Sequence, residues 1–153
     1  MFTARYLNKS INQAIHTPIQ ISLGDPKFKL PYQLRGIAGR ILPTYDLLQL
    51  TDEEEYRERY IQRLERIGGA EMVFDALKKL AEPKKKIVLL CFEDIRKPGV
   101  WCHRRMFAEW WTDKRGDEVP ELEEQEPPVY SAKERKDELK ALNAQQYAGT
   151  LFE

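Results

Sequence analysis

The sequence predicts an α/β fold in three layers, with a small, mostly parallel sheet flanked by helices and a charged helical tail at the C-terminus. Two observations lead to this prediction. Residues 87–92, IVLLCF, form a continuous apolar run with charged residues on both sides, which is typical of a strand buried on both faces of a parallel sheet. After Pro98-Gly99 the period changes, and apolar side chains recur at intervals of three and four from Val100 to Trp110, which indicates a helix with one buried face.

The composition indicates one folded domain of ordinary size. Of the 153 residues, 42% are hydrophobic and 33% are charged, and no apolar run approaches the ~20 residues that span a membrane. The 25 basic residues balance 25 acidic ones, so nucleic-acid binding would need a local basic patch. No secretory signal opens the sequence, so we expect a cytoplasmic protein without a membrane partner, whose two cysteines are thiols or a reactive pair.

The N-terminal part predicts two strands and a long loop. Residues 2–7 alternate weakly and predict the first strand. Residues 19–23 alternate between apolar and polar side chains and predict the second, after a break at Thr17-Pro18 and before a Gly-Asp-Pro turn. Residues 27–43 lack a clean period, and we interpret them either as an irregular connection packed on the core or as a cover over a binding site.

Two helices are predicted in the middle of the chain. Thr51 and Glu54 form a capping box, and the helix that follows has an apolar stripe that includes Tyr56 and Tyr60. A Gly-Gly pair ends this helix, and a second amphipathic helix stops before Pro83.

The composition shifts towards charged residues near the C-terminus. Residues 117–122 predict a short edge strand, and an acidic linker that contains proline follows. Ser131 and Glu134 form a second capping box before a highly charged helix. We therefore expect an α/β domain over residues 1–122 and an acidic linker with a charged helical tail over residues 123–153. The tail packs lightly on the domain, on a protein partner or on a second copy, or it is partly disordered.

Reactive side chains follow the buried strand and open the next helix, where ligands bind in open α/β sheets. Cys102 lies near the predicted helix N-terminus, which favours a thiolate nucleophile, but the same N–H groups together with Arg104 would also suit a phosphate or carboxylate. His103 is either an acid–base group or a buried histidine bonded to the backbone. Glu93 is a general base, an orienting partner for Arg104 or an exposed loop acid. Cys91 is a core residue, a second thiol or a disulfide partner of Cys102.

Metal and cofactor motifs are not evident. A zinc site made from Cys91, Cys102 and His103 lacks an obvious fourth ligand, and its spacing fits none of the common patterns. The sequence contains no Walker loop, no Gly-x-Gly-x-x-Gly and no Gly-x-Ser-x-Gly. We therefore expect neither a metal nor a cofactor.

The segment LLCFE followed by CHRRMFAEWW resembles the signature of the family called domain of unknown function 488, in which a strand ends in Leu-Cys-x-Glu and Cys-His-Arg opens a helix. ISLGDPK at residues 21–27 resembles the second-strand motif of that family, and Leu-Pro-Thr at residues 42–44 resembles its middle loop. The pair Tyr56 and Tyr60 resembles its paired-tyrosine helix, and VPEL at residues 119–122 is similar to the end of this branch of the family. The resemblance covers about residues 2–122 and implies a three-layer α/β domain with a pocket formed by these motifs. Cys91, Glu93, Cys102, His103 and Arg104 are the matching positions, and the resemblance implies no particular reaction. Our candidate catalytic residues are Cys102, His103 and Glu93, and our candidate ligand-binding residues are Arg104, Cys91, Ser22, Gly24, Lys27, Thr44, Tyr56 and Tyr60.

Three functional hypotheses follow. In the first, the pocket binds a small anionic ligand, derived from a nucleotide or nucleoside, through Arg104 and the helix N-terminus; Leu23 stands where the family usually has an arginine, which favours sequestration over turnover. In the second, a hydrolase or transferase acts on a nucleobase, nucleotide or glycosidic bond through Cys102 or Glu93. In the third, the protein is a non-catalytic interaction module whose tail contacts a partner.

Overall fold

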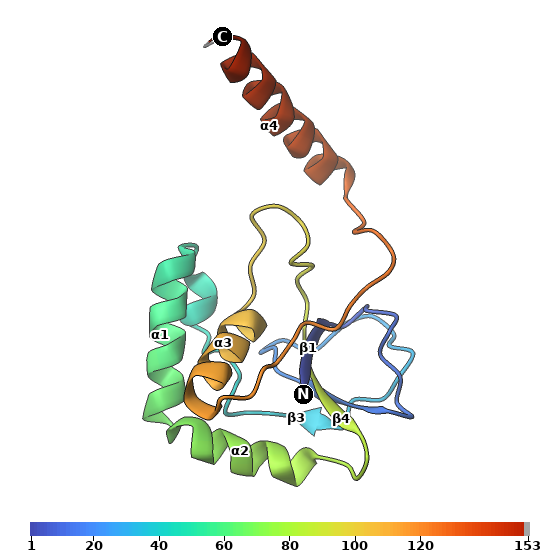
Figure 1. Ribbon diagram of the computed structural model, residues 1–153, viewed down its shortest axis with the longest axis vertical. Coiled ribbons are helices and arrows are strands. Elements are labelled where there is room, and N and C mark those ends of the chain that lie inside the picture. The colour runs from blue at the N-terminus through green and yellow to red at the C-terminus, as the bar shows by residue number, and fades with distance from the viewer. Residues whose placement is uncertain (152–153) are drawn as a thin grey trace.

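The protein is built around a four-stranded sheet in which neighbouring strands run parallel. The computed structural model describes the backbone of residues 1–151 and the side chains of residues 1–144. The strand order is β1-β4-β2-β3, so the last of these strands in the sequence lies inside the sheet (Figure 1). The prediction of an α/β fold with a small parallel sheet is confirmed. The strands span Phe2–Arg5 (β1), His16–Gln20 (β2), Gly36–Ile37 (β3) and Lys86–Cys91 (β4).

The central position of β4 explains its continuous apolar sequence. It pairs with β1 on one side and with β2 on the other. Val88 and Leu90 pack with one hydrophobic cluster, Leu89 packs with the other, and all three are fully buried. A strand with solvent on one face would instead carry polar residues at alternate positions.

β2 begins earlier than the sequence pattern predicted. We expected residues 19–23, after a break at Pro18, but the strand covers His16–Gln20 and includes the proline. The carbonyl of Pro18 accepts a hydrogen bond of 2.8 Å from the backbone N–H of Arg35, on the β3 side. The backbone N and O atoms of one residue in a parallel strand point to the same side, so the position of the missing N–H of Pro18 also faces β3. The pairing of β3 with β2 begins only at Gly36, opposite Ile19. The proline therefore removes no hydrogen bond between β2 and β4.

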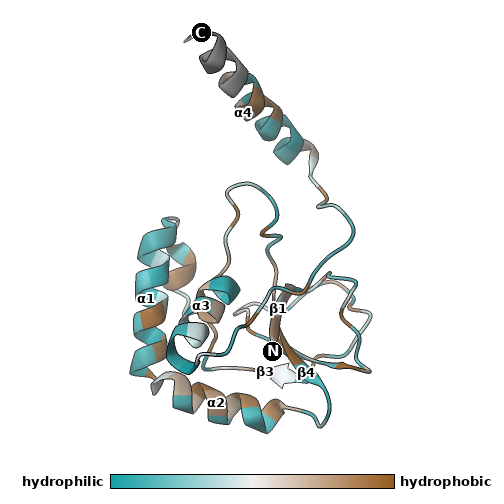
Figure 2. Ribbon diagram, viewed as in Figure 1, coloured by the Kyte–Doolittle hydropathy of each residue, from teal (hydrophilic) through white to brown (hydrophobic). Residues whose placement is uncertain are grey.

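Three helices pack against one face of the sheet (Figure 1), and each of them carries hydrophobic residues between hydrophilic ones (Figure 2). They are α1 (Glu53–Arg66), α2 (Gly69–Leu80) and α3 (His103–Arg115). Tyr60, Leu64 and Val73 are fully buried in the shared core. The core on this side also contains α3, and seven of its thirteen residues are buried, so α3 lies deepest among the helices.

The opposite face of the sheet is covered by connections instead of helices. Tyr6, Ile11 and Tyr32 pack there against the β1 and β4 side chains. The hydroxyl of Tyr32 donates a hydrogen bond of 2.6 Å to the backbone carbonyl of Tyr6 and so ties two of these connections together. The third layer of the fold therefore consists largely of loops. The predicted loop over residues 27–43 supplies part of this layer, and it also contains the two residues of β3, which belong to the sheet.

The ends of α1 are fixed by one acidic cap and one glycine. The N-cap is Asp52, whose carboxylate accepts a hydrogen bond of 2.9 Å from the backbone N–H of Glu55, so the prediction of Thr51 as the cap was wrong by one residue. Gly68 separates α1 from α2 with φ at 120°, and a Cβ atom there would lie 2.3 Å from Cγ of Met72. A larger residue at this position would be strained for both reasons.

The C-terminal segment runs along the domain before it forms the last helix, α4 (Ala132–Leu151). The predicted edge strand is reduced to a single parallel bridge between Thr3 and Glu121. In the acidic linker, Glu124 forms an ion pair of 2.8 Å with Arg5. The predicted capping box at the start of α4 is present, and this largely hydrophilic helix extends away from the domain (Figures 1 and 2). Within the described part of the chain, no helix combines the length and apolar character needed to cross a membrane.

Candidate functional site

The end of β4 and the start of α3 bring two thiols and an imidazole into contact. Cys91 is the last residue of β4, Cys102 is the N-cap of α3, and His103 is the first residue of that helix. The Nδ1 atom of His103 lies 3.7 Å from Sγ of Cys91 and 3.8 Å from Sγ of Cys102. All three residues are buried, and both cysteines are free thiols. Nδ1 is therefore positioned to exchange a proton with either sulfur.

A backbone carbonyl fixes the orientation of the His103 ring. The Nε2 atom lies 2.7 Å from the carbonyl oxygen of Ile21, which can only accept, so Nε2 carries a proton. The ring of Tyr60 packs edge-on against the imidazole with 5.5 Å between centroids, and its hydroxyl donates to the carbonyl of Ile41. Because Nε2 is held by Ile21, Nδ1 is the nitrogen that faces the thiols. Tyr60, predicted to bind a ligand, is fully buried behind the histidine.

The pKa values of the two thiols are shifted in opposite directions. Burial alone would raise the pKa of Cys102, but the hydrogen bonds with Cys91 and His103 and the charge of Arg104 outweigh it, so this pKa lies well below its usual value. The pKa of Cys91 is raised by its hydrogen bond to Cys102 and by burial. Burial would lower the pKa of His103, yet contact with Cys102 raises it overall. The proton distribution this favours is a thiolate at Cys102 beside a protonated imidazole.

Glu93 adds a carboxyl group to the same cluster. The residue is partly exposed to solvent, but one carboxyl oxygen lies 3.2 Å from Sγ of Cys91, at the position of a hydrogen-bond acceptor. Burial of the carboxyl group, followed by the nearby charge of Cys102, raises the pKa of Glu93. A carboxyl group with a raised pKa keeps its proton to higher pH, which suits a role as a proton donor.

A cleft of about 420 Å³ opens onto this cluster. Its walls are mainly apolar and aromatic, and the ring of Trp101 meets that of Tyr56 edge-on with 5.0 Å between centroids. No lysine or arginine is found among its lining residues, all of which belong to the described part of the chain. The lining thus suits an uncharged, planar group better than a phosphate. It consists of Ser22, Leu23, Gly24, Pro43, Leu48, Leu50, Tyr56, Cys91, Phe92, Glu93, Trp101, Cys102 and His103.

The turn after β2 forms one wall of the cleft and is held by polar side chains. Ser22 donates its hydroxyl proton to the carbonyl of Gly24 at 2.7 Å, so the hydroxyl of Tyr6, 2.5 Å away, must be the donor to Ser22. Gln20 donates to the carboxylate of Asp25 at 2.9 Å. These bonds hold the backbone of the turn in place beside the thiols.

Arg104 does not face the cleft. Its side chain is only 1% exposed, and its Nε donates to both carboxylate oxygens of Glu121 at 2.9 and 3.1 Å. The predicted role in binding a ligand directly is therefore wrong for this structure. The guanidinium instead acts from behind the cluster, where its positive charge helps to lower the pKa of Cys102.

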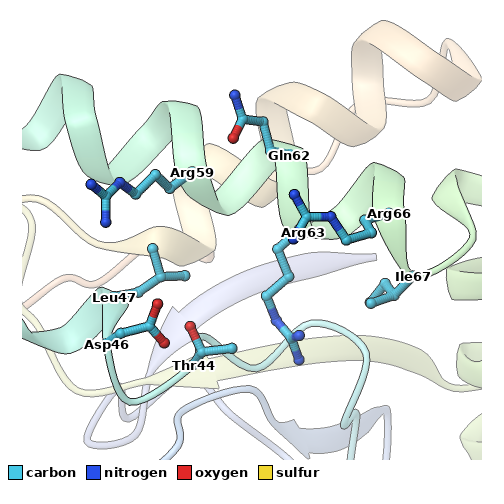
Figure 3. A pocket seen from close by; sticks show the side chains of 8 residues that line it. All are labelled: Thr44, Asp46, Leu47, Arg59, Gln62, Arg63, Arg66 and Ile67. Atoms are coloured by element: carbon cyan, nitrogen blue, oxygen red, sulfur yellow. The ribbon is translucent and has the colours of Figure 1, made fainter.

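Two other predicted binding residues lie elsewhere. Lys27 is exposed and does not line the cleft. Thr44 lines a separate hollow of about 320 Å³ along α1, where the side chains of Arg59, Arg63 and Arg66 surround it (Figure 3). The structure thus gathers Cys91, Glu93, Cys102, His103, Ser22, Gly24 and Tyr56 at one cleft and places the remaining predicted residues behind it or outside it.

Several cleft residues were not predicted from the sequence. Trp101 comes directly before Cys102, so its position beside the thiol was a signal that could have identified it. Leu48 and Leu50 belong to the 3₁₀ segment η1 (Leu47–Gln49) and the residue after it, and they enter the cleft through packing that no local pattern indicates.

The ligand atoms of Cys91, Cys102 and His103 lie within 4.8 Å of one another, so these are the residues that could hold a metal ion. No comparable group of three such residues occurs elsewhere among the described residues. Comparison with models of known protein families, with curated proteins and with solved structures finds no match. The resemblance to the domain of unknown function 488 family therefore stays a prediction from the sequence motifs.

Proposed function

We propose that the cleft is the active site of an enzyme that carries out hydrolysis or group transfer, with Cys102 as the nucleophile. The observation that carries this proposal is the contact between Sγ of Cys102 and Nδ1 of an imidazole whose other nitrogen is held by the Ile21 carbonyl. A nucleophile, a base and a group that orients the base form the arrangement common to enzymes that use covalent catalysis. Here the orienting group is a backbone carbonyl.

Each group has a role in the proposed reaction. His103 takes the thiol proton of Cys102 at Nδ1, and Sγ bonds to an electrophilic carbon of the substrate while the bond to the leaving group breaks. The proton then passes from His103 to the leaving group. The carboxyl group of Glu93, which lies beside Cys91, is a second possible proton donor. In the second half of the reaction, water or an acceptor displaces the sulfur and restores the thiol.

The cleft lining supports a substrate with a planar, weakly charged group, and a nucleobase fits this description. Trp101 and Tyr56 offer aromatic surfaces, and Ser22 offers a polar atom at the turn. A nucleoside or a base would therefore bind more favourably than a molecule recognised mainly through its phosphates. The candidate reaction is cleavage or transfer at a nucleobase or at its glycosidic bond.

Alkylation by iodoacetamide, followed by peptide mass spectrometry, tests the nucleophile. The protein is first treated with a chelator and a phosphine reductant, so that neither bound metal nor a disulfide masks the sulfur. We expect Cys102 to react at least tenfold faster than Cys91, and we expect His103→Gln to remove most of this difference. Tyr56→Phe serves as a control because it keeps the aromatic wall. Equal rates at the two cysteines would contradict the proposal.

A second candidate function, binding of a small anionic ligand, is favoured by the hollow along α1. Three arginines line it against a single carboxylate, Asp46, which leaves a positive excess (Figure 3). A thermal-shift series with inorganic phosphate and with nucleotides tests it. Stabilisation of the unmodified protein should be lost in Arg66→Ala and kept in Arg135→Ala, which removes the same charge from α4. Equal stabilisation of both variants would rule the hollow out as the binding site.

A further inference from the structure

We propose that Cys91, Cys102 and His103 bind one soft divalent cation of the zinc class, and that this ion switches off the nucleophile of the proposed function. The inference rests on that function only for its regulatory part. A sulfur whose electron pair is bound to a metal ion cannot attack a substrate, so the ion and the reaction compete for Cys102.

The spacing of the ligand atoms matches a tetrahedral site. Zinc lies about 2.3 Å from a cysteine sulfur and about 2.0 Å from a histidine nitrogen, so sulfur and nitrogen on one tetrahedral ion are about 3.6 Å apart. Nδ1 of His103 lies 3.7 Å from one sulfur and 3.8 Å from the other, and the three atoms fall within 4.8 Å of one another. An ion could therefore enter with only small movements of the side chains.

The surroundings of His103 also suit a metal ligand. Histidines that bind metals usually donate their other ring N–H to a carbonyl or carboxylate, which fixes the tautomer and the orientation of the ring. The hydrogen bond from Nε2 to Ile21 does this, and once Nδ1 has released its proton, its lone pair is directed towards the two sulfurs.

The donor set determines the kind of ion. Two sulfurs and one imidazole favour zinc and other soft ions over magnesium and calcium, which prefer oxygen ligands. On binding, the cluster releases two protons, one from the thiol of Cys91 and one shared between Cys102 and Nδ1 of His103, and the two thiolates balance the charge of a divalent ion. The cluster borders the cleft, so a fourth position is open to water or to a small ligand beside Glu93.

The two ligand-bearing elements explain why a sequence pattern did not indicate this site. Cys91 ends a strand and Cys102 begins a helix, with the connecting loop between them. Common zinc motifs place cysteine pairs two to four residues apart in one turn. Here the sheet edge and the helix N-terminus supply the convergence instead.

Cobalt(II) is the probe, because a tetrahedral thiolate site gives it visible absorption bands and a thiolate-to-cobalt charge-transfer band. The full chain is reduced, freed of metal with a chelator and titrated with Co²⁺ and then with Zn²⁺. We expect one Co²⁺ per chain, displaced by one equivalent of Zn²⁺. Cys91→Ser and Cys102→Ser should each bind Co²⁺ at least 100-fold more weakly, while Tyr45→Phe, at an exposed position that does not line the cleft, should bind as the unmodified chain does.

Circular dichroism of each variant checks that it has folded, and His103→Gln provides a third variant that keeps both thiols. The inference is overturned if the folded serine variants bind Co²⁺ as tightly as the unmodified chain, or if that chain shows no charge-transfer band. Zn²⁺ should also slow alkylation of Cys102 at least tenfold. Rapid alkylation of a chain that binds no metal would remove this inference and keep the proposed function. Metal binding together with slow alkylation of the metal-free chain would keep the metal site, but it would remove the proposed function and the regulatory part of the inference.

Discussion

Replacing Glu121 with alanine should destabilise the protein strongly, because it leaves a buried arginine without its charge partner. Arg104 is 1% exposed, and its Nε donates to both oxygens of Glu121. Its Nη1 atom has no hydrogen-bond partner among the described residues, so after the loss of Glu121 the guanidinium is compensated mainly by the charge of Cys102. Removing one member of a buried ion pair costs about 3–5 kcal/mol, and because Glu121 is 27% exposed, we expect a loss near the lower end, about 3 kcal/mol.

Urea denaturation, followed by circular dichroism, measures this loss. With a slope of about 2 kcal/mol per molar urea, a loss of about 3 kcal/mol lowers the midpoint by about 1.5 M. Lys114→Ala is the matched control, since it breaks an ion pair with Glu65 in which both side chains are 44% exposed. That variant should change the free energy of unfolding by less than about 1 kcal/mol.

A double variant separates the ion pair from simple packing. Arg104→Met combined with Glu121→Leu removes both charges, and it should recover much of the stability lost in Glu121→Ala. If Glu121→Ala costs less than about 1 kcal/mol, the guanidinium does not depend on this carboxylate. Arg104 would then be free to turn towards a ligand, and our description of it as a buried supporting charge would fail.

Three further variants test the local structure. Asp52→Ala should lower the stability by about 1 kcal/mol in the same urea assay, whereas Thr51→Ala should change it little, because the cap of α1 is Asp52. A larger loss in Thr51→Ala than in Asp52→Ala would identify Thr51 as the cap instead. Tyr60→Phe should cost about 1–2 kcal/mol, since it leaves the buried Ile41 carbonyl without a donor; an unchanged midpoint would mean that water replaces the hydroxyl. Ser131→Ala should reduce the helical circular dichroism signal of α4 and leave the melting temperature of the domain unchanged, and a lower melting temperature would instead show that α4 supports the domain.

The sequence predicted the elements whose side-chain patterns depend on burial alone. The continuous apolar run of β4 indicated a strand with two buried faces, and the change of period after it indicated α3. Once a parallel sheet was expected, the ends of these two elements had to lie near each other. The predicted bounds of β2 were displaced because a proline in a sequence usually indicates a break in a strand. Only the position of β3 explains why the missing N–H of Pro18 costs no hydrogen bond between β2 and β4.

Contacts between residues far apart in the sequence could not be predicted from local sequence patterns. The cleft wall from Leu48 and Leu50 depends on how η1 packs, and the partner of Arg104 is a glutamate that follows α3. Lys27 and Thr44 were assigned through the family resemblance, and neither lines the cleft. A shared motif can indicate which residues belong to a fold without indicating which of them meet.

The helix geometry of α3 explains why a run of three basic residues provides only one group at the cleft. Successive residues of an α-helix point in directions about 100° apart, so adjacent side chains cannot share one target. His103 reaches Ile21 and the thiols, whereas Arg104 turns to Glu121 and Arg105 donates to the carbonyl of Val119. The two arginines therefore anchor the chain that follows α3, and the cleft receives only the imidazole. This division favours chemistry at a thiol or a metal ion over recognition of a phosphate at the same place.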